Sequence, residues 1–219
     1  MGQRMEPIKD TKLVNRITDI LAAREDAYGR RLFALWYIGI NMGLRIGDML
    51  ALKVGDLRNA EIYCLEPGKQ RHLREYRERR KAEAENRPIR ELKPQEVRYT
   101  IPPGVRRMMR DRYSDAPADA PIFASRRKGP GGRIRAISRQ QALCDIRRIG
   151  EIAGLDFRMG CHTLRKTFGY QRYKESRDIA FLQKWFQHSS TAITLIYIGM
   201  DDEAFRRRID GSATDTYGK

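Results

Sequence analysis

The chain has few of the residues that crosslink a protein or hold a structural metal. Its 219 residues include three cysteines, Cys64, Cys144 and Cys161, and no two of them form a CxxC pair. An odd number of widely spaced cysteines argues against a disulfide framework. His162 follows Cys161 directly, but two adjacent ligands without others nearby make a poor zinc site. We therefore expect reduced thiols in a cytosolic protein and no bound metal.

Long apolar runs are also missing. The longest, around Leu32–Ile40, is far too short to cross a bilayer and is typical of a buried helix. The N-terminal residues are polar and show no signal peptide. We expect no membrane partner.

Acidic residues are outnumbered by basic ones. Lys and Arg total 44 against 28 Asp and Glu, which gives a formal net charge of +16. Such an excess favours a polyanionic partner, because each phosphate contact releases counterions. Charge alone would suit a ribosomal or a membrane-surface protein equally well, and a basic face can simply be solvated. The partner has to be identified from the chemistry of particular residues.

Helical periodicity dominates the chain. Apolar spacing predicts helices over Asp10–Ala23 and Arg30–Asn41, and Gly43 then fits a left-handed C-terminal cap. Arg45 is expected at the start of the next short helix, which Asp48 would support. Further helices are predicted over residues 103–113, 138–154, 162–174, 178–188, 190–198 and 202–209, followed by a disordered tail at 211–219.

A small β region interrupts the helices. Glu61–Leu65, Pro88–Glu91 and Val97–Ile101 are predicted as three antiparallel strands, the last two pairing across a turn at Lys93–Glu96. The fold class is therefore α+β and mainly helical. Lys69–Asn86 is dense in charge and has almost no apolar stripe, which predicts a solvated helix or a flexible arm. Contact with DNA is the sharper alternative, because arginine is in surplus there.

A set of polar residues gathers in the C-terminal third. His162-Thr-Leu-Arg165 places a histidine and an arginine on one helix face, His188 follows, and Tyr197 comes nine residues later. Arg45 stands far upstream in Met-Gly-Leu-Arg-Ile-Gly-Asp. Guanidinium groups can hold the non-bridging oxygens of a phosphodiester, imidazoles can assist, and a phenol can be the nucleophile. Taken singly, His162 and Arg165 would be a capping histidine and a surface arginine.

Together these motifs resemble the catalytic domain of the tyrosine recombinases, or phage integrase family. The resemblance covers about residues 6–209 and rests on four stretches, Gly-Leu-Arg-Ile-Gly-Asp-Met-Leu-Ala-Leu-Lys-Val-Gly-Asp-Leu, His-Thr-Leu-Arg, Gln-His-Ser-Ser and the final tyrosine. It implies that family's catalytic-domain fold over residues 1–210, with a charged insertion at 66–88. It also implies that the family's N-terminal core-binding domain is absent.

The resemblance assigns a role to each candidate residue. Arg45 and Arg165 look like the two arginines that clamp the scissile phosphate. His162 looks like the general base near the nucleophile, His188 like a further donor to the phosphate, and Tyr197 like the nucleophile.

The family also uses a lysine on a β-hairpin turn as the general acid to the leaving 5′ oxygen. Lys93 matches that position, and Lys69 is the alternative because the insertion makes the register ambiguous. Either lysine could instead be an ordinary solvated side chain. The chain departs from the family at Phe186-Gln187-His188, where Leu-Gly-His is usual.

The implied activity is site-specific DNA strand exchange through a 3′-phosphotyrosyl intermediate. Bond energy is conserved in that intermediate, so no cofactor is implied. The alternatives are a type IB topoisomerase and a catalytically silent regulator of a recombinase. The implied partners are double-stranded DNA, three further copies of this chain in a homo-tetramer on paired sites, and an accessory DNA-binding protein. The expected location is the cytoplasm, in association with the nucleoid.

Overall fold

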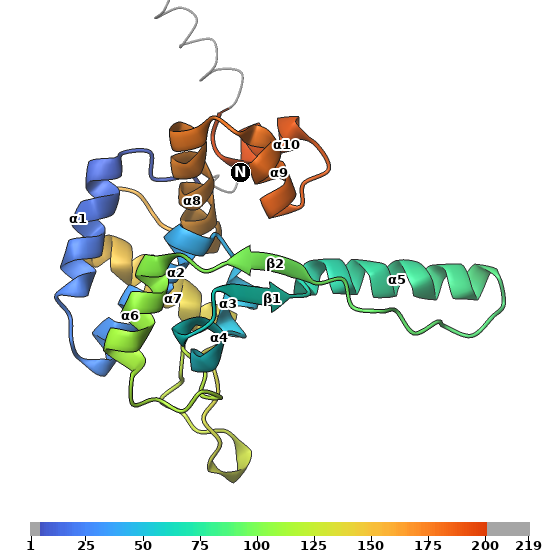
Figure 1. The fold of residues 1–219 in the computed structure, drawn as a ribbon, viewed down its shortest axis with the longest axis horizontal. Helices are drawn as coiled ribbons and strands as arrows, with labels where there is room; N and C mark the ends of the chain where they lie inside the picture. The colour runs from blue at the N-terminus through green and yellow to red at the C-terminus, as the bar shows by residue number, and fades with distance from the viewer. Residues whose placement is uncertain (1–4, 201–219) are drawn as a thin grey trace, which may run out of the picture. The chain divides into compact units, whose positions relative to one another are not determined.

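The protein is mainly helical with one small sheet, which confirms the α+β class (Figure 1). The computed structural model describes residues 5–200. The chain divides into two compact units. Of the described residues, the terminal unit consists of 5–43 and 143–200, and the central unit is Leu44–Ala142.

The terminal unit is a helical assembly. Its elements are α1 (Thr11–Ala22), α2 (Ala27–Met42), most of α7 (Arg139–Ile152), α8 (Cys161–Ser176), α9 (Ile179–Phe186) and α10 (Thr191–Tyr197). The α1 helix begins at Asp10, whose carboxylate accepts a hydrogen bond from the Lys12 amide at 2.8 Å. The apolar run predicted as a buried helix is the centre of α2, where Leu35 and Trp36 are completely buried. This core holds α8 in place, since α2 packs along it.

The end of α2 is fixed by a glycine, as predicted. Gly43 has a φ of 58°, the left-handed conformation of a helix C-cap. A side chain there would also collide with the ring of Phe168 on α8. Both constraints place the Gly43 carbonyl group beside α8, where it meets one of the candidate arginines.

A buried ion pair ties α7 to α2. Arg31 Nε donates to Asp145 Oδ2 at 2.9 Å, and the Tyr28 hydroxyl donates to the other carboxylate oxygen at 3.2 Å. Asp145 is fully buried. Burial, reinforced by the nearby Asp145 carboxylate, raises the pKa of the Tyr28 phenol. The carboxylate is therefore satisfied by two partners from one helix, which sets how α7 packs.

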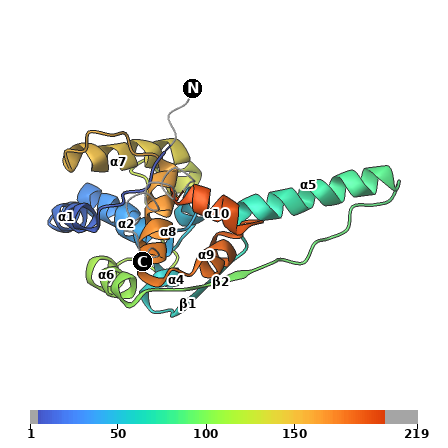
Figure 2. The same cartoon turned by 90° about the horizontal axis from the view of Figure 1, so that it is seen from above.

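The central unit carries the sheet. Its elements are α3 (Ile46–Leu50), α4 (Val54–Arg58), β1 (Ile62–Leu65), α5 (Gly68–Ala84), β2 (Val97–Thr100), α6 (Pro103–Tyr113) and a 3₁₀ turn at Pro130–Gly132. Strands β1 and β2 pair antiparallel, from Ile62 opposite Thr100 to Leu65 opposite Val97. The two strands are joined by α5 and by an extended return segment, residues 85–96 (Figure 2).

The prediction of a third strand at Pro88–Glu91 is wrong, because the only sheet among residues 5–200 has two strands. The return segment bonds to the α5 helix instead of to a strand. The Arg90 amide donates to Glu78 Oε1 at 2.9 Å, which occupies a backbone donor that a strand ladder would need. Lys93 consequently lies in the return segment and not in the turn of a tight hairpin.

The charged insertion is a helix, one of the two predicted outcomes. Of the 17 residues of α5, Ala82 is the one that is buried. The predictions at 103–113, 138–154, 162–174, 178–188 and 190–198 correspond to α6, α7, α8, α9 and α10. The helix predicted at 202–209 and the tail at 211–219 lie outside the described residues. No helix between residues 5 and 200 is long and apolar enough to cross a membrane.

Candidate active site

The six candidate residues are divided between the two units. His162, Arg165, His188 and Tyr197 belong to the terminal unit, and their side chains gather around the N-terminal half of α8. Arg45 and Lys93 belong to the central unit. Each group has its own local geometry.

The closest functional contact joins a histidine to the candidate nucleophile. His162 Nδ1 lies 3.1 Å from the hydroxyl oxygen of Tyr197, and the two rings meet edge to face at 87°. His162 stands in the first turn of α8, which begins at Gly160, where the Gly160 amide donates to Thr163 Oγ1 at 3.1 Å. When Nδ1 is the unprotonated ring nitrogen, it accepts the phenolic proton. The pair therefore has the geometry of a nucleophile and its base.

Arg165 is a buried cation whose position is set by main-chain carbonyl groups. Its side chain donates to the carbonyl oxygen of Gly43 and, at 3.2 Å, to that of Phe186, and 3% of the residue is exposed. Its guanidinium carbon lies 4.4 Å from the centroid of the Phe186 ring. These two carbonyl groups orient the guanidinium. Arg165 is thus a buried guanidinium one helical turn from His162.

The contacts of His188 define which ring nitrogen carries a proton. Its Nδ1 lies 3.1 Å from Thr194 Oγ1, and that hydroxyl donates its one proton to the Ser190 carbonyl oxygen at 3.1 Å. When the Thr194 hydroxyl donates to Ser190 in this way, it accepts from His188, and Nδ1 carries the hydrogen. Donation to a phosphate from the other nitrogen, Nε2, requires the doubly protonated imidazolium. Thr194 is completely buried and was not singled out from the sequence.

The chain departs from the family pattern at Gln187, the residue before His188, and this departure has two local costs. Gln187 is the C-cap of α9 and has a φ of 56°, in the left-handed region that favours glycine. Its side-chain oxygen is buried with no hydrogen-bond partner among the described residues. The usual glycine would avoid both costs. The His188 backbone keeps its place even so, because its amide donates to the Gln183 carbonyl oxygen at 3.0 Å.

A second buried cation, missed by the sequence reasoning, lies beside the candidate nucleophile, Tyr197. Lys166 Nζ is 5.2 Å from the centroid of the Tyr197 ring, and 7% of Lys166 is exposed. A cation over the ring favours the phenolate over the phenol. The available signal was spacing, since Lys166 is four residues after His162 and so lies on the same face of α8.

Other tyrosines have environments that work against ionisation. Burial, with the carboxylates of Asp56 and Asp48, raises the pKa of Tyr63 in the central unit to about 12. Burial and Asp145 raise the pKa of Tyr28 in the terminal unit. Tyr197 instead faces a lysine and two histidines. Its environment has the charge and the proton acceptor that a tyrosine nucleophile needs.

The central unit presents Arg45 at the start of a short helix, as predicted. Arg45 is the N-cap residue of α3 and is partly exposed. Asp48, expected to support that helix, is buried in its first turn and accepts a hydrogen bond from the Gly68 amide at 3.0 Å. Asp48 therefore also joins α3 to the first residue of α5.

The two candidate lysines lie at opposite ends of the stretch that joins β1 to β2. Lys69 is in the first turn of α5, and Lys93 is exposed in the return segment. The Lys93 carbonyl accepts from Arg74, whose other terminal nitrogen pairs with Glu66 at 2.6 Å. These contacts anchor the backbone at Lys93 and do not decide which of the two lysines is the general acid.

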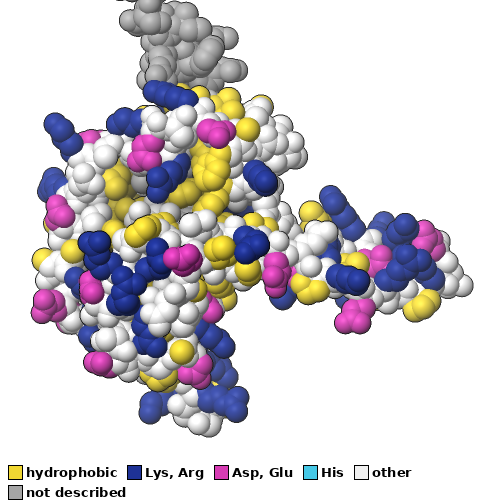
Figure 3. All heavy atoms as spheres, viewed as in Figure 1, with side chains coloured by type: hydrophobic (Ala, Val, Ile, Leu, Met, Phe, Trp, Pro, Cys, Tyr) yellow, Lys and Arg dark blue, Asp and Glu magenta, His cyan; other side chains and the backbone are white. Residues whose placement is uncertain are grey.

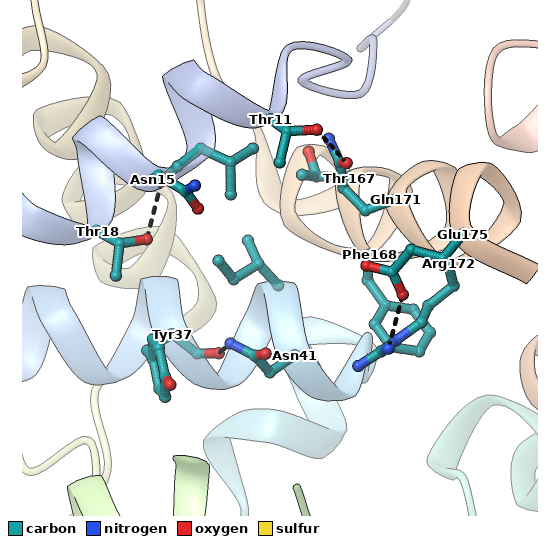
Figure 4. A pocket seen from close by; sticks show the side chains of 12 residues that line it. Thr11, Asn15, Thr18, Tyr37, Asn41, Thr167, Phe168, Gln171, Arg172 and Glu175 are labelled. Carbon is teal, nitrogen blue, oxygen red and sulfur yellow. Dashed lines mark hydrogen bonds and ion pairs between the residues drawn. The ribbon is translucent and has the colours of Figure 1, made fainter.

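The terminal unit also contains a cavity of about 350 Å³ between α1, α2 and α8 (Figure 4). Its lining residues include Asn15, Asn41 and Gln171 as well as the apolar side chain of Phe168. Within the described chain, its lining includes no candidate catalytic side chain. Residues 5–200 contain no group of three His, Cys, Asp or Glu side chains placed to hold a metal ion.

Known proteins share this combination of fold and motifs. The sequence matches the phage integrase family over residues 10–204. It is 31% identical over 202 residues to the probable integrase/recombinase YoeC of Bacillus subtilis (strain 168), covering 92% of this chain and 93% of that protein. The chain therefore belongs to the phage integrase family, the tyrosine recombinases.

Solved structures show the same fold at low sequence identity. The crystal structure of XerA recombinase superposes with a TM-score of 0.65 at 19% identity, over 97% of this chain and 65% of that one. XerH site-specific recombinase, in a post-cleavage complex with palindromic difH substrate, gives 0.62 at 17% identity, over 95% of this chain and 54% of that one. This chain thus spans nearly all of the Bacillus protein but less than two thirds of either crystallised recombinase.

Proposed function

We propose that this chain is a site-specific DNA strand-exchange enzyme that cleaves and rejoins DNA through Tyr197. The observation that carries the proposal is the 3.1 Å contact between the Tyr197 hydroxyl and His162 Nδ1. His162 shares a face of α8 with Lys166, and the buried Arg165 is on the same helix. Family membership and the net charge of +16 both support DNA as the substrate.

The first step breaks one DNA strand. His162 accepts the phenolic proton as the Tyr197 oxygen attacks the phosphorus, which forms a 3′-phosphotyrosyl ester and releases the 5′ oxygen. That oxygen takes a proton from a lysine, Lys93 in the first instance and Lys69 as the alternative. In the second step a 5′ hydroxyl of the partner strand gives its proton to that lysine and attacks the ester, and Tyr197 recovers its proton from His162. One phosphoester is exchanged for another in each step.

Cationic side chains stabilise the charge that builds on the phosphate. Arg165 supplies a guanidinium that is already oriented by main-chain carbonyls, so little reorganisation is needed as the pentacoordinate phosphorus forms. The imidazolium form of His188 would donate from Nε2. Arg45 is the second arginine of the clamp in this proposal, on the strength of the Gly-Leu-Arg-Ile motif.

The partners follow from the reaction. Exchange between two duplexes needs a nucleophile for each of four strands, which supports a homo-tetramer on paired sites. An accessory DNA-binding protein belongs to the same proposal, since it would add phosphate contacts to those of this chain. XerH recombinase was crystallised with its DNA substrate, and we extend double-stranded DNA as a ligand to this chain.

Covalent trapping tests the proposal. We expect wild-type protein to form an adduct on a pool of nicked duplexes that survives denaturing electrophoresis, and Tyr197→Phe to form none while still binding DNA. Tyr173→Phe is the matched control, because Tyr173 packs against the same apolar cluster as Tyr197 and loses the same hydroxyl. An adduct that persists in Tyr197→Phe, or DNA binding by the wild type without any adduct, would contradict the assignment.

A further inference from the structure

Four of the basic residues of α5 lie apart from its acidic residues, whereas Arg71, Arg74 and Arg79 lie on the acidic side. At about 100° per residue, and beside Leu73 and Ala84, five polar side chains fall within a sector of about 120°. They are Lys69, Gln70, Arg77, Arg80 and Lys81, and we call them the α5 basic face. The acidic residues of the helix, Glu75, Glu78 and Glu83, all lie outside this sector. In Figure 3 the Lys and Arg side chains gather along the arm that α5 forms.

The return segment binds one glutamate of the acidic side, Glu78, while Glu75 pairs with Arg71 and His72 of α5 itself. Arg87 pairs with Glu78 at 2.6 Å and with Glu85 at 2.7 Å, and the Arg90 amide also donates to Glu78. The hydrogen bond from Arg87 lowers the pKa of Glu78 to about 2, so this carboxylate stays charged and engaged. Ala82, the buried residue of α5, also lies outside the basic face. The helix therefore leaves Lys69, Arg77 and Arg80 exposed on the basic face, where Lys81, also exposed, pairs with Glu85 at 3.8 Å.

Internal packing does not explain this helix. An isolated helix of this length is marginal in water, and α5 buries one small side chain. Like charges on one face also repel each other, which costs further stability. The charge separation is instead what a phosphate-binding surface needs. From Lys69 to Lys81 the basic face extends about 18 Å, which matches about five phosphates along one DNA strand.

We propose that the α5 basic face binds the phosphate backbone of duplex DNA. The choice of duplex DNA as the ligand rests on the proposed function. Because the contacts are with phosphates, they add affinity and orientation without reading the base sequence.

The test compares two double variants with the same change in charge. Arg77→Gln/Arg80→Gln removes two charges from the basic face, and Arg71→Gln/Arg79→Gln removes two from elsewhere on α5. Both keep the candidate lysines, and circular dichroism would check that both keep their helix. The probe is a short fluorescein-labelled duplex of random sequence, titrated by anisotropy at several salt concentrations.

We expect the first variant to reduce the slope of log affinity against log salt by about 1.8, and the second to change it little. When the salt concentration is raised fourfold, the affinity of the wild type should therefore fall by a factor about ten times larger than that of the first variant. Arg77→Lys/Arg80→Lys should restore the wild-type slope, because counterion release depends on charge. Equal slopes in the two glutamine variants would overturn the inference. The inference would also be overturned if the Arg77→Gln/Arg80→Gln variant lost binding to phosphatidylserine vesicles but not to duplex DNA. That result would reassign the face to a membrane surface.

Failure of this inference is distinguishable from failure of the proposed function. At low salt the Arg77→Gln/Arg80→Gln variant should still form the Tyr197 adduct, which separates anchoring from chemistry. If the wild type forms the adduct and both glutamine variants keep the wild-type salt slope, the proposed function stands and the α5 contact is rejected. If the wild type forms no adduct but the salt slope falls in the first variant alone, the α5 contact stands and the proposed function is rejected.

Discussion

Helices α8 and α5 are nearly equal in length, 16 and 17 residues, and both are rich in basic side chains, but they are built in opposite ways. Seven residues of α8 are buried, among them Arg165 and Lys166, whereas α5 buries Ala82. The buried cations of α8 are held against carbonyl groups and rings. The cations of α5 face water or pair with glutamates.

This difference separates two uses of positive charge. A buried guanidinium acts at low effective dielectric and has one position, so it can stabilise charge on one particular phosphate. Exposed cations are screened by salt and keep their side-chain freedom, so each contributes little. Several together can still hold an extended polyanion. Each of the following predictions measures one side of this contrast.

The largest effect is expected at Arg165. Replacing it with alanine removes the donors to the Gly43 and Phe186 carbonyls and the charge that would face the phosphate. We expect the rate of adduct formation to fall by about 10²–10³ and the free energy of unfolding by about 3 kcal/mol. Single-turnover cleavage and urea denaturation measure the two.

The matched control is Arg172→Ala on the same helix, whose side chain is 43% exposed and pairs with Glu175. Its stability should change by less than about 0.5 kcal/mol, with no loss of adduct. Similar losses in the two variants would show that burial does not distinguish these arginines.

A smaller effect is expected at Lys166. Lys166→Met keeps the length of the side chain and removes the cation from the face of the Tyr197 ring, so the phenolate is less favoured. We expect adduct formation to slow about tenfold near neutral pH and its pH–rate profile to move to higher pH. Lys166→Arg should recover most of the rate. A slower reaction with an unmoved profile would make Lys166 a packing residue only.

The smallest effect is local and lies in α5. The pKa of Glu78 is lowered from its ordinary 4.5 to about 2 by the hydrogen bond from Arg87. The stability that Glu78 gives to the contact between α5 and the return segment is therefore complete above about pH 4.5 and is lost as the pH falls through about 2. Hydrogen exchange at the Arg90 amide, which donates to Glu78, should lose protection over this range.

The Glu78→Gln variant supplies the control for this measurement. It should lose the same protection at neutral pH, while the core of α2 keeps its own. Unchanged exchange at the Arg90 amide from pH 4.5 to 2 would mean that Glu78 does not anchor the return segment.

Local signals in the sequence were enough to predict most of the helices. Gly43 marks a helix end because capping depends on a few neighbouring residues, and the structure confirms this cap. The strand predicted at Pro88–Glu91 failed for a non-local reason. Its backbone donor is taken by Glu78, twelve residues earlier along the chain, and no turn or alternation signal records such a contact.

The candidate site shows the same division. The sequence by itself determined the residue types, their order and the nine-residue step from His188 to Tyr197, which were enough to indicate the family. Only the tertiary structure placed the Tyr197 hydroxyl beside His162, brought Lys166 to its ring, and made Thr194 fix the proton on His188. The physical reason is that helical periodicity fixes the face a side chain occupies, whereas its partners depend on how α8, α9 and α10 pack against one another.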